Sequence, residues 1–230
     1  SPMERSSISI MPRTSTSGSH ASGRFGSARE KASSRRVSAE ARFAPSSALS
    51  RWRVASPLSL PSLRAALEVS LATVRRWLAL LHELYSVFLI RPWTKRVARS
   101  LQKEAKLYLW DWSEVQDEGA RFENLVACHL LKACDYWSDT GCGEFALHSL
   151  RNKEKEEIDF LVTKKAVPWL LVEAKLSDTE PSPHFRKFLR YFPNTPALQV
   201  VRAPNMWAQR SSEGREILVA SASEALACFV

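Results

Sequence analysis

Charged residues inside two apolar segments constrain this chain more than any other feature. One segment, residues 157–162, places Asp159 among large apolar residues, and the other, residues 170–175, ends with Glu173 and Lys175. Side chains alternate along a strand, so Glu173 and Lys175 are predicted to project from the same face. A lone buried carboxylate is costly, so these acids need charged partners or a metal ion.

The second half of the chain has the pattern of an α/β fold. Phe122, Leu125, Val126 and Leu130 follow helical spacing and predict a helix over residues 119–133, which also contains Glu123. Strands are predicted at residues 144–150, 157–162, 169–172, 197–201 and 217–220, with a helix at 184–191 between the third and fourth. This order indicates a mixed sheet with helices packed on it.

Residues 55–112 predict a winged helix-turn-helix. Ser59 and Ser70 are typical helix N-caps, and the second helix places Val74, Trp77, Leu78, Leu81 and Tyr85 on one side. Two short apolar segments follow, joined by a basic loop that would form the wing. The alternative is a plain helical hairpin packed on a neighbouring domain.

The N-terminal segment, residues 1–54, differs in composition from the rest. Residues 1–50 include 15 Ser and 7 Arg without apolar periodicity, so we expect a disordered tail. Gly18 and Gly23 have the spacing of the two glycines in a phosphate-binding loop. Arg24 and Phe25 follow Gly23, however, where such a loop requires Lys and then Ser or Thr. This segment therefore predicts no nucleotide site.

The charge of the chain is unevenly distributed. The formal net charge is +9; residues 51–106 contain 11 Lys and Arg against 3 Asp and Glu, whereas residues 107–230 contain 14 against 18. A basic region beside an acidic one favours DNA as a partner. The predicted contacts lie on the second helix and the basic loop: Thr73, Arg75, Arg76, Lys95, Arg96 and Arg99. The alternative is a solvated basic face that has no partner.

The arrangement of Asp159, then Glu173-x-Lys175, with Glu123 on the preceding helix, resembles the PD-(D/E)XK nuclease superfamily. More closely, residues 58–230 resemble the uncharacterised C-terminal region of bacterial and archaeal AAA-type ATP-binding proteins, in which a winged helix precedes a restriction-endonuclease-like domain. The strings that carry this likeness are SLATVRRWL from Ser70, KLYLWD from Lys106, GARFENLVA from Gly119, EIDFL from Glu157 and VEAK from Val172. Ile158 stands where the superfamily motif has Pro, and the Ser-rich segment stands where that family has its ATPase module.

The resemblance implies a nuclease-like domain over residues 113–230 and a chemistry for its acids. Asp159 and Glu173 would bind one or two Mg²⁺ ions, with Glu123 as a further ligand or supporting group. Lys175 would orient the attacking water or stabilise the transition state. The protein would then be a DNA-interacting, Mg²⁺-dependent phosphodiesterase. The alternative is an inactive scaffold with a Glu173–Lys175 ion pair, acting as a non-catalytic docking module of an AAA-type ATPase.

Further expectations concern partners and location. ATP would bind only through an upstream ATPase domain, and that module or a second copy of the chain is a further expected partner. No run of 18 apolar residues occurs, so no membrane contact is expected. Cys128, Cys134, Cys142 and Cys228 have no zinc-site spacing and predict reduced thiols in a cytoplasmic protein.

Overall fold

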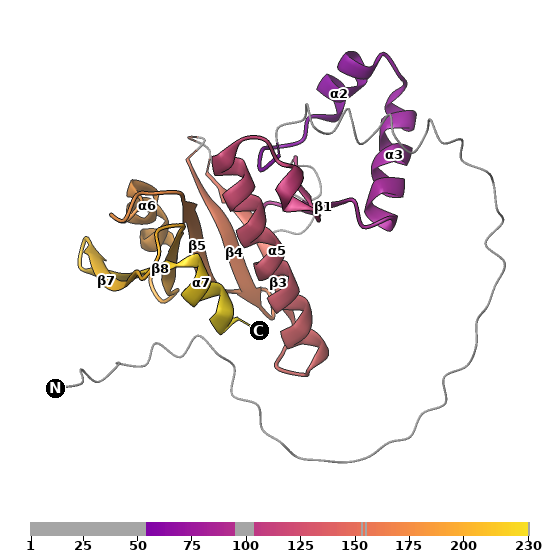
Figure 1. The fold of residues 1–230 in the computed structure, drawn as a ribbon. Coiled ribbons are helices and arrows are strands. Elements are labelled where there is room, and N and C mark those ends of the chain that lie inside the picture. Colours follow the sequence, from indigo (N-terminus) through magenta and orange to yellow (C-terminus); the bar gives the residue numbers. More distant parts are fainter. Residues whose placement is uncertain (1–53, 95–103, 153, 155, 230) are drawn as a thin grey trace.

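The computed structural model describes residues 54–94, 104–152, 154 and 156–229 (Figure 1). Within these residues the chain forms five α-helices and eight strands, a mixture of helices and sheets consistent with the predicted α/β class. The predicted N-terminal tail lies outside the described residues except for Val54. The predicted DNA contacts Lys95, Arg96 and Arg99 also lie outside them.

The first part of the described chain is a helix pair followed by a hairpin. Helix α2 spans Leu60–Leu67 and α3 spans Leu71–Glu83. The side chains of Ser59 and Ser70 accept hydrogen bonds from backbone N–H groups of the two first turns, as the sequence predicts. Strands β1, Val87–Ile90, and β2, Lys106–Leu109, pair antiparallel as a separate two-stranded sheet.

A long helix leads into the main sheet. Helix α5 spans Glu118–Asp139 and follows a short 3₁₀ turn, η1, at Trp112–Glu114. The sheet consists of β3 (Phe145–Arg151), β4 (Glu157–Lys164), β5 (Val167–Lys175), β6 (Ala197–Val201), β7 (Trp207–Ser212) and β8 (Arg215–Ser221). Helix α6, Pro183–Tyr191, connects β5 to β6, and α7 (Ala222–Ala225) and η2 (Leu226–Cys228) end the described chain.

The six strands lie in the order β3-β4-β5-β6-β8-β7. The first three are antiparallel, β5, β6 and β8 are parallel, and β7 returns antiparallel to β8. The sheet is therefore mixed, as predicted.

Each face of the sheet has its own hydrophobic core. On one face, α5 and α7 pack together with residues of α2, α3 and the β1–β2 hairpin, so this core runs from Val54 to Phe229. On the other face, Phe185, Phe188 and Leu189 of α6 pack on the sheet. Figure 1 shows α5 along the sheet and the α2–α3 pair beyond one end of it.

The two edges of the main sheet differ. Along β3, backbone bonds join Ser149 to Arg91 and Trp93, because the Trp93 N–H donates to the Ser149 carbonyl and the Ser149 N–H donates to that of Arg91. At the opposite edge, β7 has β8 as its one neighbour within the part of the chain that the structure describes.

Three differences from the sequence predictions stand out. Helix α5 continues six residues beyond the predicted end at 133, because Trp137 is buried against Phe145 and Trp169. Strand β7 is absent from the prediction. Tyr85 follows the end of α3 at a φ of 52° and is 73% exposed, so it lies outside the apolar face of that helix.

No helix among the described residues has the length and hydropathy needed to cross a membrane.

Candidate functional site

Asp159 and Glu173 face each other where the pairing of β4 with β5 ends. The last paired residues are Phe160 and Val172. Beyond them, the Asp159 N–H donates to Glu173 Oε2 at 3.2 Å, and the Ala174 N–H donates to Asp159 Oδ2 at 2.9 Å. Each carboxylate therefore takes the place of a backbone acceptor on the neighbouring strand, which brings the two predicted acids together.

Glu173 is 1% exposed and is surrounded by donors. Its Oε1 lies 2.9 Å from Lys175 Nζ and accepts a hydrogen bond from Ser182 Oγ at 3.1 Å. The Nδ1 atom of His184 lies 3.6 Å from the same oxygen. Burial lowers the pKa of Lys175, but Glu173, Asp159 and Glu123 together more than offset this, so the pKa of Lys175 is raised. The predicted shared face of Glu173 and Lys175 is confirmed.

Lys106 is the residue that brings the remaining acids together. It belongs to β2, is 3% exposed, and holds its Nζ 3.1 Å from Glu123 Oε1, 3.4 Å from Glu157 Oε1 and 3.8 Å from Asp159 Oδ1. The Tyr108 hydroxyl donates to the same Glu123 oxygen at 2.8 Å. A residue of the first part of the chain thus pairs with carboxylates of α5 and β4.

The charged groups of this site carry a formal excess of negative charge. We define the acid site as Lys106, Glu123, Glu157, Asp159, Glu173 and Lys175. Four carboxylates meet two ammonium groups. Burial raises the pKa of Glu123, although Lys106 and Tyr108 oppose this. Burial, Glu123 and Glu173 together raise the pKa of Asp159 well above its usual range. Burial lowers the pKa of Lys106, but its carboxylate neighbours raise it above the ordinary value.

The acid site does not fit a Mg²⁺ ion in this arrangement. Its oxygens are of the right chemical kind, since Mg²⁺ prefers carboxylate ligands. However, the Lys106 ammonium lies among Glu123, Glu157 and Asp159, and Glu173 is directed to Lys175 and Ser182 instead. No group of three His, Cys, Asp or Glu within residues 54–94, 104–152, 154 and 156–229 is placed to hold a metal ion. The predicted magnesium site stays a prediction.

The predicted DNA contacts are only partly within the described chain. Arg75 and Arg76 are exposed on α3; Arg76 lies opposite the buried residues Val74, Leu78 and Leu81, and Arg75 lies to one side of them. Thr73 differs, because its N–H donates to Ser70 Oγ at 3.1 Å and its Oγ1 lies 2.8 Å from that same oxygen. Thr73 is thus part of the helix cap.

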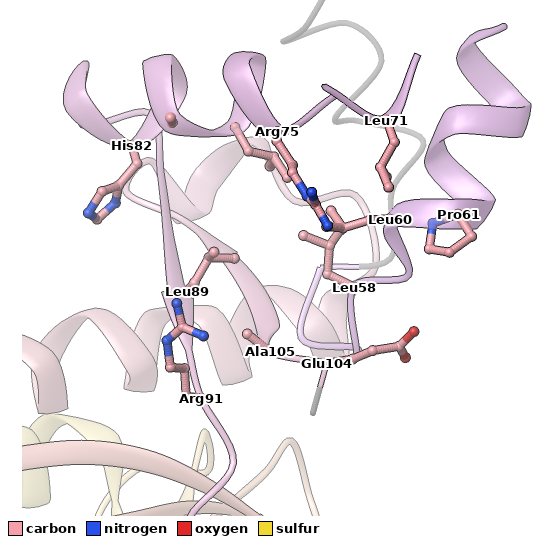
Figure 2. A pocket seen from close by; sticks show the side chains of 12 residues that line it. Leu58, Leu60, Pro61, Leu71, Arg75, His82, Leu89, Arg91, Glu104 and Ala105 are labelled. Atoms are coloured by element: carbon pink, nitrogen blue, oxygen red, sulfur yellow. The ribbon is translucent and has the colours of Figure 1, made fainter. Parts of the chain in front are cut away.

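Beside Arg75 lies a pocket of about 560 Å³ between α3, the start of α2 and β1. Leu58, Leu60, Leu71 and Leu89 line it with further apolar residues, and Arg75 and Arg91 extend toward it from α3 and from below (Figure 2). Arg75 is therefore both an exposed cation and the border of an apolar hollow.

Sequence reasoning missed Lys106 and Glu157 as members of the acid site, and Ser182 as a hydrogen-bond donor to Glu173. The signal for Lys106 was present, because Lys106 and Tyr108 alternate with Leu107 and Leu109 and so share one face of a strand. For Ser182, which lies seven residues after Lys175, no local pattern points to Glu173.

The free-thiol prediction agrees with the structure, in which Cys128, Cys134, Cys142 and Cys228 form no disulfide. Burial raises the pKa of Cys128 to about 11 and that of Cys134 to about 12. The thiols of Cys128 and Cys134 therefore stay protonated near neutral pH and are not suited to nucleophilic chemistry.

Comparison with known proteins identifies two regions. Residues 35–114 match the model of a domain of unknown function, DUF8612, and residues 118–220 match the model of another, DUF4143. No curated protein and no solved structure matches the chain. The two matches lie one after the other along the chain, and the description of neither model states a function.

Proposed function

We propose that the protein binds duplex DNA through its first part, residues 54–109, acting as a winged helix. The observation that carries this proposal is the exposed Arg75–Arg76 pair on α3, outside the face that packs into the core. The order helix, helix, hairpin is the order that a winged helix requires. Helix α3 would then lie against the DNA.

The charge distribution supports a DNA contact in the same part of the chain. The region from residue 51 to 106 has a net charge of +8, whereas residues 107–230 have −4. Cations that neutralise DNA phosphates release condensed counterions, so binding weakens with salt at a slope of about 0.9 per phosphate contact. A basic first part beside a mildly acidic domain favours the first part as the DNA contact.

This proposal is tested by replacing both arginines. Arg75→Ala/Arg76→Ala should weaken duplex binding and reduce the log–log salt slope by about 1 to 2. The matched control is Arg210→Ala/Arg215→Ala on the β7–β8 hairpin, which removes the same charge elsewhere. An unchanged slope in the first variant, or an equal loss in the control, would contradict the assignment to α3.

A second candidate function is Mg²⁺-dependent phosphodiester hydrolysis by a PD-(D/E)XK-like domain, which requires the Lys106 ammonium group to move away from Glu123, Glu157 and Asp159 before the ion can bind. The observation that favours it is the convergence of Asp159, Glu173 and Lys175 at one place on adjacent strands, with Glu123 nearby. Cleavage of duplex or single-stranded DNA should be assayed with Mg²⁺ and Mn²⁺. Metal-dependent cleavage that disappears in both Asp159→Asn and Lys175→Ala would support it, and cleavage that survives Asp159→Asn would assign the activity elsewhere.

The competing function is a non-catalytic docking module of an AAA-type ATPase. Its support is the match of residues 118–220 and the apolar pocket beside α3. Docking predicts no cleavage with either metal ion. It also predicts no effect of Arg75→Ala/Arg76→Ala on DNA affinity, so the two experiments above distinguish it.

A further inference from the structure

We propose that Lys106 is the resident cation of the acid site, in the position that a divalent ion would otherwise take. This inference goes beyond DNA binding, and it arises from the disagreement between the expected metal and the observed contacts. The Lys106 ammonium lies within 4 Å of three carboxylates that come from α5 and β4.

The contact distances suit an ammonium ion. The separations of 3.1 Å and 3.4 Å from Glu123 and Glu157 are those of hydrogen-bonded and close ion-paired groups. A Mg²⁺ ion binds its oxygens at about 2.0–2.1 Å and keeps several waters. The ion and the ammonium group therefore cannot occupy this position together.

The Lys106 side chain is also firmly placed. Leu107 and Leu109 on either side of Tyr108 are buried in the core, and β2 pairs with β1 from Lys106 to Leu109. The Tyr108 hydroxyl binds the same Glu123 oxygen from the neighbouring position on that face of the strand. The ammonium group is thus held by the fold of the first part of the chain.

A route for an external cation exists beside it. A cavity of about 220 Å³ is lined by Lys106, Glu157, Arg151 and Asn152 with residues of the β1 and β2 ends. Glu157 and Lys106 both line this cavity, so removing the ammonium group would leave a space between the cavity and the two other carboxylates that Lys106 contacts, Glu123 and Asp159. Four carboxylates would then face the cations Lys175 and Arg151, and a divalent ion would offset the two negative charges that remain unpaired.

The test measures Mn²⁺ binding to the full chain. Two readouts are used: the paramagnetic resonance signal of free Mn²⁺ and the temperature of thermal unfolding. Wild type and Lys187→Met, a surface control that removes a lysine paired with Glu156, should bind equally weakly. Lys106→Met should bind one Mn²⁺ at least tenfold more tightly, and Mn²⁺ should raise its unfolding temperature. Adding Asp159→Asn to Lys106→Met should abolish that gain.

Two results would overturn the proposal. One is wild-type binding as tight as that of Lys106→Met and sensitive to Asp159→Asn. The other is a folded Lys106→Met that binds Mn²⁺ no better than wild type. If Lys106→Met fails to fold, the wild-type protein decides. Wild-type Mn²⁺ binding that is lost in Asp159→Asn contradicts a resident lysine, and the absence of such binding supports it. DNA affinity is measured separately, so failure of this proposal leaves the α3 assignment intact.

Discussion

At the scale of single residues, Asn124 links α5 to the β1–β2 hairpin. This fully buried amide accepts from the Leu109 N–H at 2.8 Å and donates to the Leu109 carbonyl at 2.7 Å. Asn124→Ala leaves the buried Leu109 N–H without its acceptor and leaves the Leu109 carbonyl with the weak Cys128 thiol donor at 3.4 Å, so it should lower the free energy of unfolding by about 1–3 kcal/mol. Urea unfolding measures this, with the exposed Gln116→Ala as control. A loss no larger than that of the control would show that water replaces the amide.

His148 should make the protein sensitive to mild acid. Burial lowers the pKa of this imidazole below its usual 6.5, although a backbone interaction with Arg91 opposes the shift. Below pH 6.5, His148 is therefore protonated more readily in the unfolded chain than in the folded protein. The stability that comes from keeping His148 neutral is fully present above pH 6.5. It is lost as the pH falls from 6.5 through the lower pKa of His148 in the folded protein. Urea unfolding at pH 7 and pH 5 should show a smaller loss for His148→Gln than for wild type, and equal losses would contradict this origin.

At the scale of elements, the start of α5 depends on Asp117. Its Oδ1 accepts a hydrogen bond from the Ala120 N–H at 2.8 Å. Asp117 lies at the N-terminus of the helix, where the partial positive charge of the helix dipole favours a carboxylate. Asp117→Ala should cost about 1 kcal/mol of unfolding free energy, whereas Asp117→Asn keeps an acceptor and should cost less. Asp139→Ala at the opposite end is the control and should be neutral or slightly stabilising. An equal loss at both ends would rule out capping as the cause.

Most elements were predictable because their signal is local. Serine caps fix the starts of α2 and α3, and apolar runs reveal β4, β5 and β6. Strand β7 was missed because its side chains are mostly exposed and its pairing with β8 alone defines it. Asp159, Glu173 and Lys175 were found because charges inside apolar strands are conspicuous. Lys106 was missed as their partner because it reaches them only through the tertiary fold.

At the scale of the whole molecule, one hydrophobic core joins the helix pair to the main sheet. The described chain should therefore unfold in a single transition, with tryptophan fluorescence and far-ultraviolet circular dichroism superimposed. Leu78→Ala on α3 and Leu189→Ala on α6 should each lower the free energy of unfolding by about 2–5 kcal/mol. Both should shift the same transition. An early separate step in Leu78→Ala alone would show that the helix pair unfolds independently.

The backbone bonds of Ser149 to residues 91–93 have a consequence for assembly. They occupy the β3 edge at Ser149, whereas the β7 edge of the described sheet carries no added strand. A strand from a second molecule would therefore meet fewer obstacles at β7 than at β3. Addition at β7 alone pairs two molecules, whereas continuous growth into a fibre needs two open edges.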